Sequence, residues 1–180
     1  MKLKNKKNDF IMFGIIYAIT IMICHNFLQM HYSSDTYVLA ELGYMNYPEK
    51  YFLVDGRLIS ALVCYIAGMM KVNLNVYIIG MDFIGITFIS IAVYVFAKTI
   101  QNFSEKSGLV HNIKVIMVSL ILILNVYSIE LLLFPESAVM CLGMLLMVIA
   151  SCTLVKEVRR KYIKIFFEVL LATLCYQPLL

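Results

Sequence analysis

Charged residues are scarce in this chain. Asp, Glu, Lys and Arg make up 14% of its 180 residues, whereas hydrophobic residues make up 62%. A soluble domain is about half apolar and about a quarter charged, and a chain of this length cannot hide such an excess inside one small core. The composition therefore excludes an ordinary soluble domain and predicts a protein that folds in a lipid bilayer.

The motifs of several enzyme classes are missing as well. The sequence contains no Walker A, HExxH, GxSxG or dinucleotide-binding glycine pattern, so an ATPase, a protease and a dinucleotide enzyme are unsupported. No basic stripe runs along a soluble face, which argues against a nucleic-acid partner. Lys and Arg occur instead in short clusters between long apolar runs, the pattern of a membrane protein.

Paired cysteines are also missing. None of the five cysteines has CxxC spacing, their number is odd, and all of them lie in apolar segments. Free cysteine behaves as a small buried hydrophobe, so this pattern predicts neither a disulfide framework nor a metal site. The five are Cys24, Cys64, Cys141, Cys152 and Cys175.

Long apolar runs are what the sequence has in abundance. A helix needs about 20 apolar residues to cross the hydrocarbon core of a bilayer. Four segments meet this requirement, and a fifth is apolar but shorter. They are residues 10–27, 75–97, 115–134, 137–155 and 165–180. The apolar segment 58–70 is shorter than such a helix needs to be.

The placement of Lys and Arg selects between two topologies. If residues 58–70 crossed the membrane, the basic loops 98–114 and 156–164 would face outward, against the positive-inside rule. If they lie in the membrane interface, both loops and the lysine-rich N-terminus face the cytoplasm. The second topology predicts an all-α bundle of about five spans, with an extracytoplasmic loop 28–74 that contains short interfacial helices. No repeat or linker divides residues 1–180, which form one membrane domain.

The loop between the first two spans has the composition of a binding surface. Residues 28–60 contain several tyrosines together with acidic and basic side chains. A plain connector would be shorter and richer in Gly, Ser and Asn, and long loops of this kind often carry function.

Asp35 is the candidate catalytic residue of this loop. It follows the first span by a few residues, and a carboxylate at that level can act as a general base on a sugar hydroxyl. The alternative is that Asp35 caps a helix running from Thr36 to Leu42, because Ser-Ser-Asp is good N-cap chemistry. From spacing alone, the cap is favoured.

Two further candidates in the loop are Arg57 and His31. Arg57 can make a two-pronged contact with a phosphate at the headgroup level. The equally weighted alternative is a snorkelling anchor at a helix end, with Asp55 as its neighbour or cap. His31 is a substrate-binding candidate, although a lone interfacial histidine is more often structural.

Acidic residues also occur beyond the first loop. Glu130 and Glu136 flank the second outer turn, and Glu130 is a candidate to line the same outer cavity as Asp35. A solvated turn is the alternative and is slightly favoured. Asp82 lies well inside the second span, where an acid marks either a functional site or a hydrogen bond between helices.

The order of these features resembles the bacterial GT-C glucosyltransferase domain family, polytopic enzymes that modify O-antigen and related surface glycans. Four stretches carry the resemblance across most of the chain. They are His31 to Asp35 after the first span, Asp55 to Arg57 before the short apolar segment, Asn125 with Glu130, Phe134 and Ser137 between two spans, and Tyr176 to Pro178 at the outer end of the fifth.

The resemblance implies transfer of glucose, or a similar sugar, from a polyprenyl-phosphate donor to a glycan acceptor outside the bacterial cytoplasmic membrane. Asp35 would be the catalytic base, and Arg57 would hold the donor phosphate. The remaining substrate-binding residues would be Asp55, His31, Glu130, Tyr176 and Gln177.

The resemblance implies no cofactor. Family members often carry adjacent acids in the first loop, whereas here Ser34 precedes Asp35, which removes a possible metal partner and leaves a divalent cation unsupported. Family members are also longer, with further spans after the Tyr-Gln region. The chain is therefore expected to be the N-terminal part of such a domain.

Two other functions stay open on the sequence. One is a non-enzymatic membrane protein, such as a lipid-linked sugar flippase or an accessory subunit, in which charged residues line a path through the spans. Asp82, well inside the second span, is the residue that would line such a path. The other is a truncated product without function.

Overall fold

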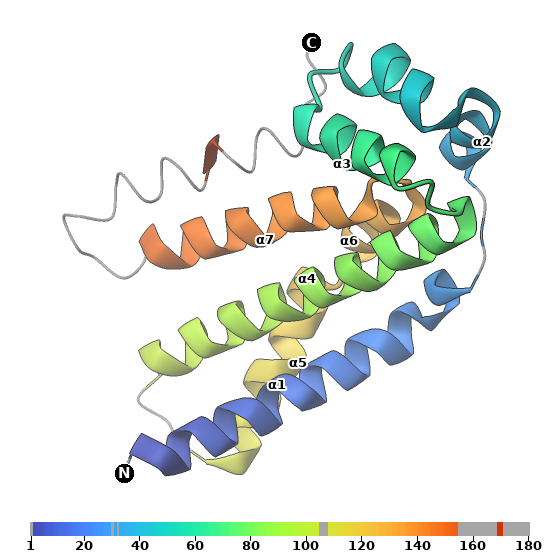
Figure 1. Cartoon of the computed structure of the whole chain (residues 1–180). Helices are drawn as coiled ribbons and strands as arrows, with labels where there is room; N and C mark the ends of the chain where they lie inside the picture. The colour runs from blue at the N-terminus through green and yellow to red at the C-terminus, as the bar shows by residue number, and fades with distance from the viewer. Residues whose placement is uncertain (1, 30, 32, 105–107, 155–168, 171–180) are drawn as a thin grey trace.

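The computed structural model describes residues 2–29, 31, 33–104, 108–154 and 169–170. Within these ranges the chain is helical, as the sequence predicts. Figure 1 shows the long helices lying beside one another, with α4 in contact with α1, α5 and α7. The long helices are α1 (Lys2–Cys24), α4 (Leu74–Phe103), α5 (Leu109–Ile123) and α7 (Ser137–Leu154).

Shorter elements connect the long helices. The segment between α1 and α4 contains α2 and α3, which pack against each other and against η2. A second group of short elements joins α5 to α7. The short elements are η1 (His25–Leu28), α2 (Ser34–Tyr47), η2 (Pro48–Phe52), α3 (Leu58–Met69), α6 (Val126–Glu130) and η3 (Leu131–Leu133).

Three helical segments are long and apolar enough to cross a membrane, and a bent pair makes a fourth. The three are Asn8–Leu28, Leu74–Phe103 and Ser137–Leu154. They match three of the spans that the sequence predicts, so the chain has the helices of a multi-pass membrane protein. The predicted fifth span, 165–180, lies almost wholly outside the described residues.

The span predicted at 115–134 is bent. Leu109–Ile123 and Val126–Leu133 meet at an angle of 60°. The break occurs where the side chain of Asn125 accepts a hydrogen bond from the Ser128 N–H at 3.2 Å, which starts a new helix. The Ser128 hydroxyl donates to the Ile123 carbonyl. The last carbonyl groups of a helix have no partner within the helix, and this bond supplies a partner for one of them at the end of α5.

The short apolar segment predicted at 58–70 is a separate helix. Its 12 residues, Leu58–Met69, are about 18 Å long at the usual rise of an α-helix, well short of the ~30 Å hydrocarbon core. The helix at this position is therefore too short to cross the core on its own.

The cap predicted at Asp35 is wrong. The N-cap of α2 is Ser33, whose side chain accepts a hydrogen bond from the Thr36 N–H at 3.3 Å. Asp35 lies in the first turn of the helix instead, where its negative charge interacts favourably with the positive end of the helix dipole. The helix also runs past Leu42 to Tyr47, with a kink at Gly43, whose φ of 76° suits glycine.

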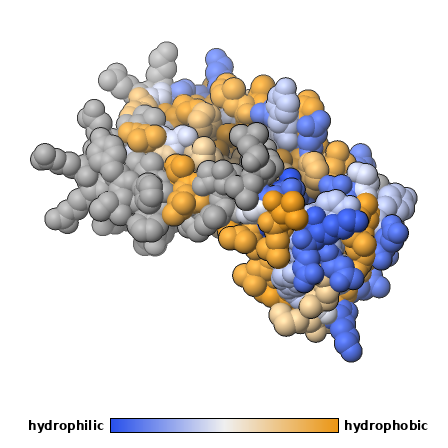
Figure 2. Space-filling model, turned by 90° about the horizontal axis from the view of Figure 1, so that it is seen from above, coloured by the Kyte–Doolittle hydropathy of each residue, from blue (hydrophilic) through white to orange (hydrophobic). Residues whose placement is uncertain are grey.

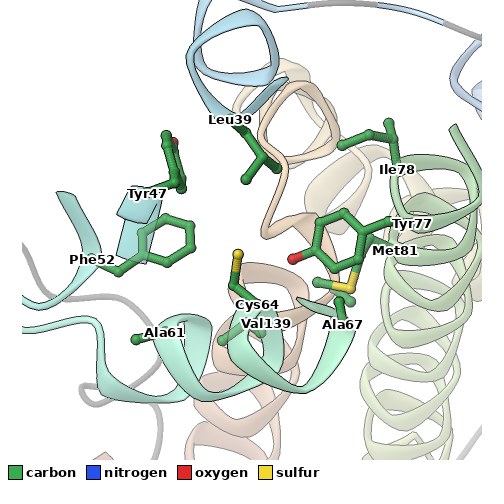
Figure 3. Packing of buried hydrophobic residues seen from close by; sticks show 11 residues of the cluster. Leu39, Tyr47, Phe52, Ala61, Cys64, Ala67, Tyr77, Ile78, Met81 and Val139 are labelled. Atoms are coloured by element: carbon green, nitrogen blue, oxygen red, sulfur yellow. The ribbon is translucent and has the colours of Figure 1, made fainter. Parts of the chain in front are cut away.

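The core between α2, α3, α4 and α7 is apolar (Figure 3). In this view the hydroxyl of Tyr77 and the sulfur of Cys64 both point toward the centre of the group. Burial raises the pKa of the Cys64 thiol to about 12, so it stays protonated and unreactive. The four cysteines that the structure describes are free and buried, as predicted, and Cys175 lies outside the described residues.

Large apolar side chains cover the outer faces of the long helices. Phe10 is 78% exposed, Met22 is 70% exposed and Ile121 is 68% exposed. A soluble monomer rarely leaves apolar patches of this extent in water. In a bilayer the same side chains contact lipid, so the exposed surface agrees with the composition.

The packing of α4 on α7 depends on Gly85. A Cβ atom at this position would lie 3.0 Å from Leu132 Cδ2 and 3.3 Å from Cys141 Sγ. Gly85→Val is therefore expected to lower the free energy of unfolding by about 1–3 kcal/mol through overpacking. Thermal unfolding of the detergent-solubilised chain, followed by circular dichroism, measures the change.

Gly80→Val is the matched control, because a Cβ at Gly80 has no neighbour within 4 Å and both glycines lie inside α4. The difference between the two variants isolates packing from helix propensity. Equal unfolding temperatures for the two variants would contradict close packing of α4 on α7.

Candidate functional site

Charged side chains from separate parts of the chain meet at one end of the helix bundle. We call the residues His31, Asp35, Arg57, Asp82 and Glu136 the charged cluster. They come from the segment after α1, the first turn of α2, the residue before α3, the first half of α4 and the residue before α7. In Figure 1 this end of the bundle lies opposite the N-terminus.

The ion pair between Arg57 and Glu136 joins two parts of the cluster that are 79 positions apart in sequence. Arg57 Nη1 donates to Glu136 Oε1. The Glu136 side chain is 1% exposed and that of Arg57 is 20% exposed. A buried carboxylate needs such a partner, because desolvation of an unpaired charge is costly.

This pair bears on one of the two interpretations of Arg57. The guanidinium turns inward to Glu136, so Arg57 is not a snorkelling anchor. Asp55 is its neighbour, with Oδ2 3.7 Å from Arg57 Nη2. Asp55 does not cap α3, because Arg57 holds the N-cap position and α3 has no side-chain cap.

Part of the ion pair is left without partners. Among the residues that the structure describes, the buried atoms Arg57 Nε and Glu136 Oε2 make no hydrogen bond. Buried polar atoms almost always have a protein or water partner. These two atoms therefore have a hydrogen-bonding capacity that no described residue satisfies.

Asp35 is electrostatically coupled to Glu136. Burial raises the pKa of Glu136 above its ordinary value, Arg57 lowers it, and the negative charge of Asp35 raises it. Burial also raises the pKa of Tyr47, and the charges of Glu136 and Asp35 add to that effect. Asp35 itself is half-buried, whereas Glu136 is enclosed. The two carboxylates therefore lie within electrostatic range of each other but differ in exposure.

His31 and Asp82 form the second contact within the charged cluster. His31 Nε2 lies 3.7 Å from Asp82 Oδ2 and 3.3 Å from the Leu132 carbonyl oxygen. The Ser137 hydroxyl donates to Asp82 Oδ1 at 2.8 Å. Asp82 thus makes the hydrogen bond between helices that the sequence left as one of two interpretations. His31 connects the segment after α1 to α4 and η3.

The remaining predicted site residues lie elsewhere. Glu130 is exposed at the end of α6, and within the described ranges it has no contact with the charged cluster. The predicted solvated turn holds for Glu130, which is exposed, but it is wrong for Glu136, which is buried. Tyr176 and Gln177 lie outside the described residues.

Sequence reasoning missed Glu136 as a site residue. A usable pattern was present, because an acid directly ahead of a long apolar helix has to be paired or solvated. The partner could not be chosen from sequence, since Lys50, Arg57 and Lys71 all lie in the same loop. Within the described ranges, no group of three or more His, Cys, Asp or Glu side chains can hold a metal ion.

The surface near this end of the molecule is mixed in polarity. Seen from above in Figure 2, hydrophilic side chains gather beside hydrophobic ones. No family model, curated protein or solved structure matches this chain. The sequence and structure of the chain itself therefore describe it, as a helical membrane protein with a charged cluster at one end of its bundle.

Proposed function

We propose that this chain is a membrane glycosyltransferase. It transfers a glucosyl or similar residue from a polyprenyl-phosphate donor to a surface glycan. The supporting observation is the meeting of Arg57, Glu136 and Asp35 at one end of a bundle of apolar helices. A lipid-linked donor places its phosphate at that level, because its polyprenyl chain lies in the hydrocarbon core.

Arg57 is suited to the donor phosphate. Glu136 holds one of its Nη atoms, whereas the other lies 3.7 Å from Asp55 Oδ2, too far for a hydrogen bond. A guanidinium held in this way presents N–H groups to a phosphate. It would neutralise the charge that develops on the phosphate as the sugar leaves.

Asp35 is suited to the acceptor. In the proposed reaction the acceptor hydroxyl attacks the anomeric carbon, and the bond from that carbon to the phosphate oxygen breaks. Asp35 takes the hydroxyl proton as general base. Glu136 is too enclosed for this role, at 1% exposure, and positions Arg57 instead. Asp35 is reachable from the surface because it is half-buried.

The proposal includes a topology. The charged cluster faces the outside of the bacterial cytoplasmic membrane, the N-terminus lies in the cytoplasm, α2 and α3 lie on the outer surface, and the chain crosses about five times. Lys and Arg placement supports this arrangement. A transport function has less support, since Asp82 is fully enclosed and bonded to Ser137 and does not line a path.

A transfer assay tests the proposed function. Membranes from bacteria that express the chain are supplied with polyprenyl-phosphate carrying a radiolabelled glucosyl group, and label in surface glycan is measured against membranes without the chain. We expect labelled glycan to form when the chain is present. Movement of the lipid-linked sugar across the bilayer, with no label in glycan, would contradict transfer and favour a flippase.

A further inference from the structure

A cleft lies at the opposite end of the bundle from the charged cluster. It has a volume of about 410 Å³ and is formed by α1, α4 and α5. Polar side chains line one part of it, and isoleucines line another. The residues that line the cleft include Asp9, Lys98, Gln101, Asn112, Ile15 and Ile113.

The polar part of the cleft contains one charge of each sign. Lys98 Nζ donates to Asp9 Oδ1, and the two side chains are 36% and 34% exposed. Beside them, Gln101 Nε2 donates to Asn112 Oδ1 at 3.3 Å. An ion pair of this exposure keeps carboxylate and ammonium atoms accessible, so it can also bind a ligand that carries both charges.

The position of the cleft matches the headgroup level of a bilayer. The first candidate span begins at Asn8, next to Asp9, and Lys98 lies near the end of α4. The isoleucines of the cleft are open to the surroundings, with Ile15 47% exposed and Ile113 52% exposed. A polar recess that continues into exposed apolar surface suits an amphiphile with a charged head and an acyl tail.

We propose that this cleft binds a phospholipid whose headgroup joins a phosphate to a primary ammonium, as in phosphatidylethanolamine. The phosphate contacts Lys98, the ammonium donates to Asp9, and an acyl chain lies along Ile15 and Ile113. This site is separate from the charged cluster and does not depend on the glycosyltransferase proposal.

Charge complementarity selects this headgroup over two common alternatives. An anionic headgroup, as in phosphatidylglycerol, would gain from Lys98 but would be repelled by the neighbouring carboxylate of Asp9. A choline headgroup is zwitterionic, but its quaternary ammonium has no N–H to donate to that carboxylate. A headgroup with a phosphate and a primary ammonium pairs with Lys98 and also donates a hydrogen bond to the carboxylate of Asp9.

The test compares lipid retention by native mass spectrometry. The purified chain is equilibrated in mixed micelles with equal amounts of dioleoyl phosphatidylethanolamine, phosphatidylcholine and phosphatidylglycerol. We expect phosphatidylethanolamine to be retained up to about fivefold more strongly than either other lipid, the upper range for a partly exposed ion pair. Equal retention of the three lipids would overturn the proposal.

Asp9→Asn identifies the site. The substitution keeps the shape of the side chain but removes its negative charge, so the order is expected to reverse and phosphatidylglycerol to be retained best. Binding of phosphatidylglycerol by the variant also shows that the cleft is still formed. Lys114→Met is the control, since Lys114 is exposed on α5 near Asn112 but does not line the cleft.

Two results would contradict this assignment. One is an unchanged lipid order in Asp9→Asn, which would place the preference elsewhere on the chain. The other is a fall in phosphatidylglycerol retention in Lys114→Met as large as its rise in Asp9→Asn, which would indicate a response to net charge at this end of the bundle in general.

Discussion

Asp35→Asn is expected to lower glycosyl transfer by about 100-fold or more, the usual loss when a general base is removed. The amide has nearly the same shape as the carboxylate but does not accept a proton at neutral pH. Asp35 is half-buried at the start of α2 and is coupled to Glu136, so its charge acts within the charged cluster. The rate of label transfer into glycan measures the effect.

Glu41→Gln is the matched control, because Glu41 is an exposed carboxylate on the same helix. It is expected to transfer sugar at the unmodified rate. The pH dependence of transfer separates a base from a positioning residue: loss of a base removes the acidic limb of the profile, whereas misplacement lowers the rate at every pH. Transfer at the full rate in Asp35→Asn would rule out the catalytic role.

Arg57→Met is expected to destabilise the fold by about 3 kcal/mol, the cost of leaving one partner of a buried ion pair alone. Glu136 is 1% exposed and would lose the cation beside it. The chain contains no tryptophan, so unfolding in detergent is best followed by far-ultraviolet circular dichroism. Lys50→Met, at an exposed lysine of η2, is the control.

The double variant Arg57→Met with Glu136→Gln tests whether the loss comes from the unpaired charge. Because the second substitution removes that charge, the double variant is expected to recover more than half of the stability lost by Arg57→Met. Losses that simply add in the double variant would contradict an energetic coupling between the two residues.

The loss in Arg57→Met is also expected to depend on pH. Burial raises the pKa of Glu136, and Arg57 opposes that effect, so removal of Arg57 raises the pKa further. A carboxyl whose pKa is raised by folding stabilises the fold below its ordinary pKa of 4.5 and loses that contribution as pH rises through the folded value. The stability deficit of the variant should therefore grow as pH rises above the folded pKa of Glu136 in the unmodified chain, which itself lies above 4.5.

The spans are the part of this protein that follows directly from sequence. Each depends on the apolar content of one continuous segment, so the segments at 75–97 and 137–155 could be predicted without their neighbours. The short helix at 58–70 was separated from the spans by its length together with the placement of Lys and Arg.

Finer local features needed the backbone geometry. Ser33, Ser34 and Asp35 are all acceptable N-cap residues, and only the position of α2 shows that Ser33 has that role. The bend at Asn125 likewise could not be predicted without the backbone geometry. Its apolar neighbours predict one span, whereas the hydrogen bond from Ser128 breaks the helix there.

The charged cluster was decided by tertiary structure. Sequence reasoning selected Arg57 and Asp35 by residue type, but Glu136 is 79 positions from Arg57 and became its partner only through packing. Asp82 and Ser137 are 55 positions apart and meet because α4 packs against α7. Hydropathy is a property of one segment, whereas an ion pair depends on how two distant segments pack. Sequence alone therefore determined that this chain has membrane-spanning helices, and the packing of those helices determined which charges share a site.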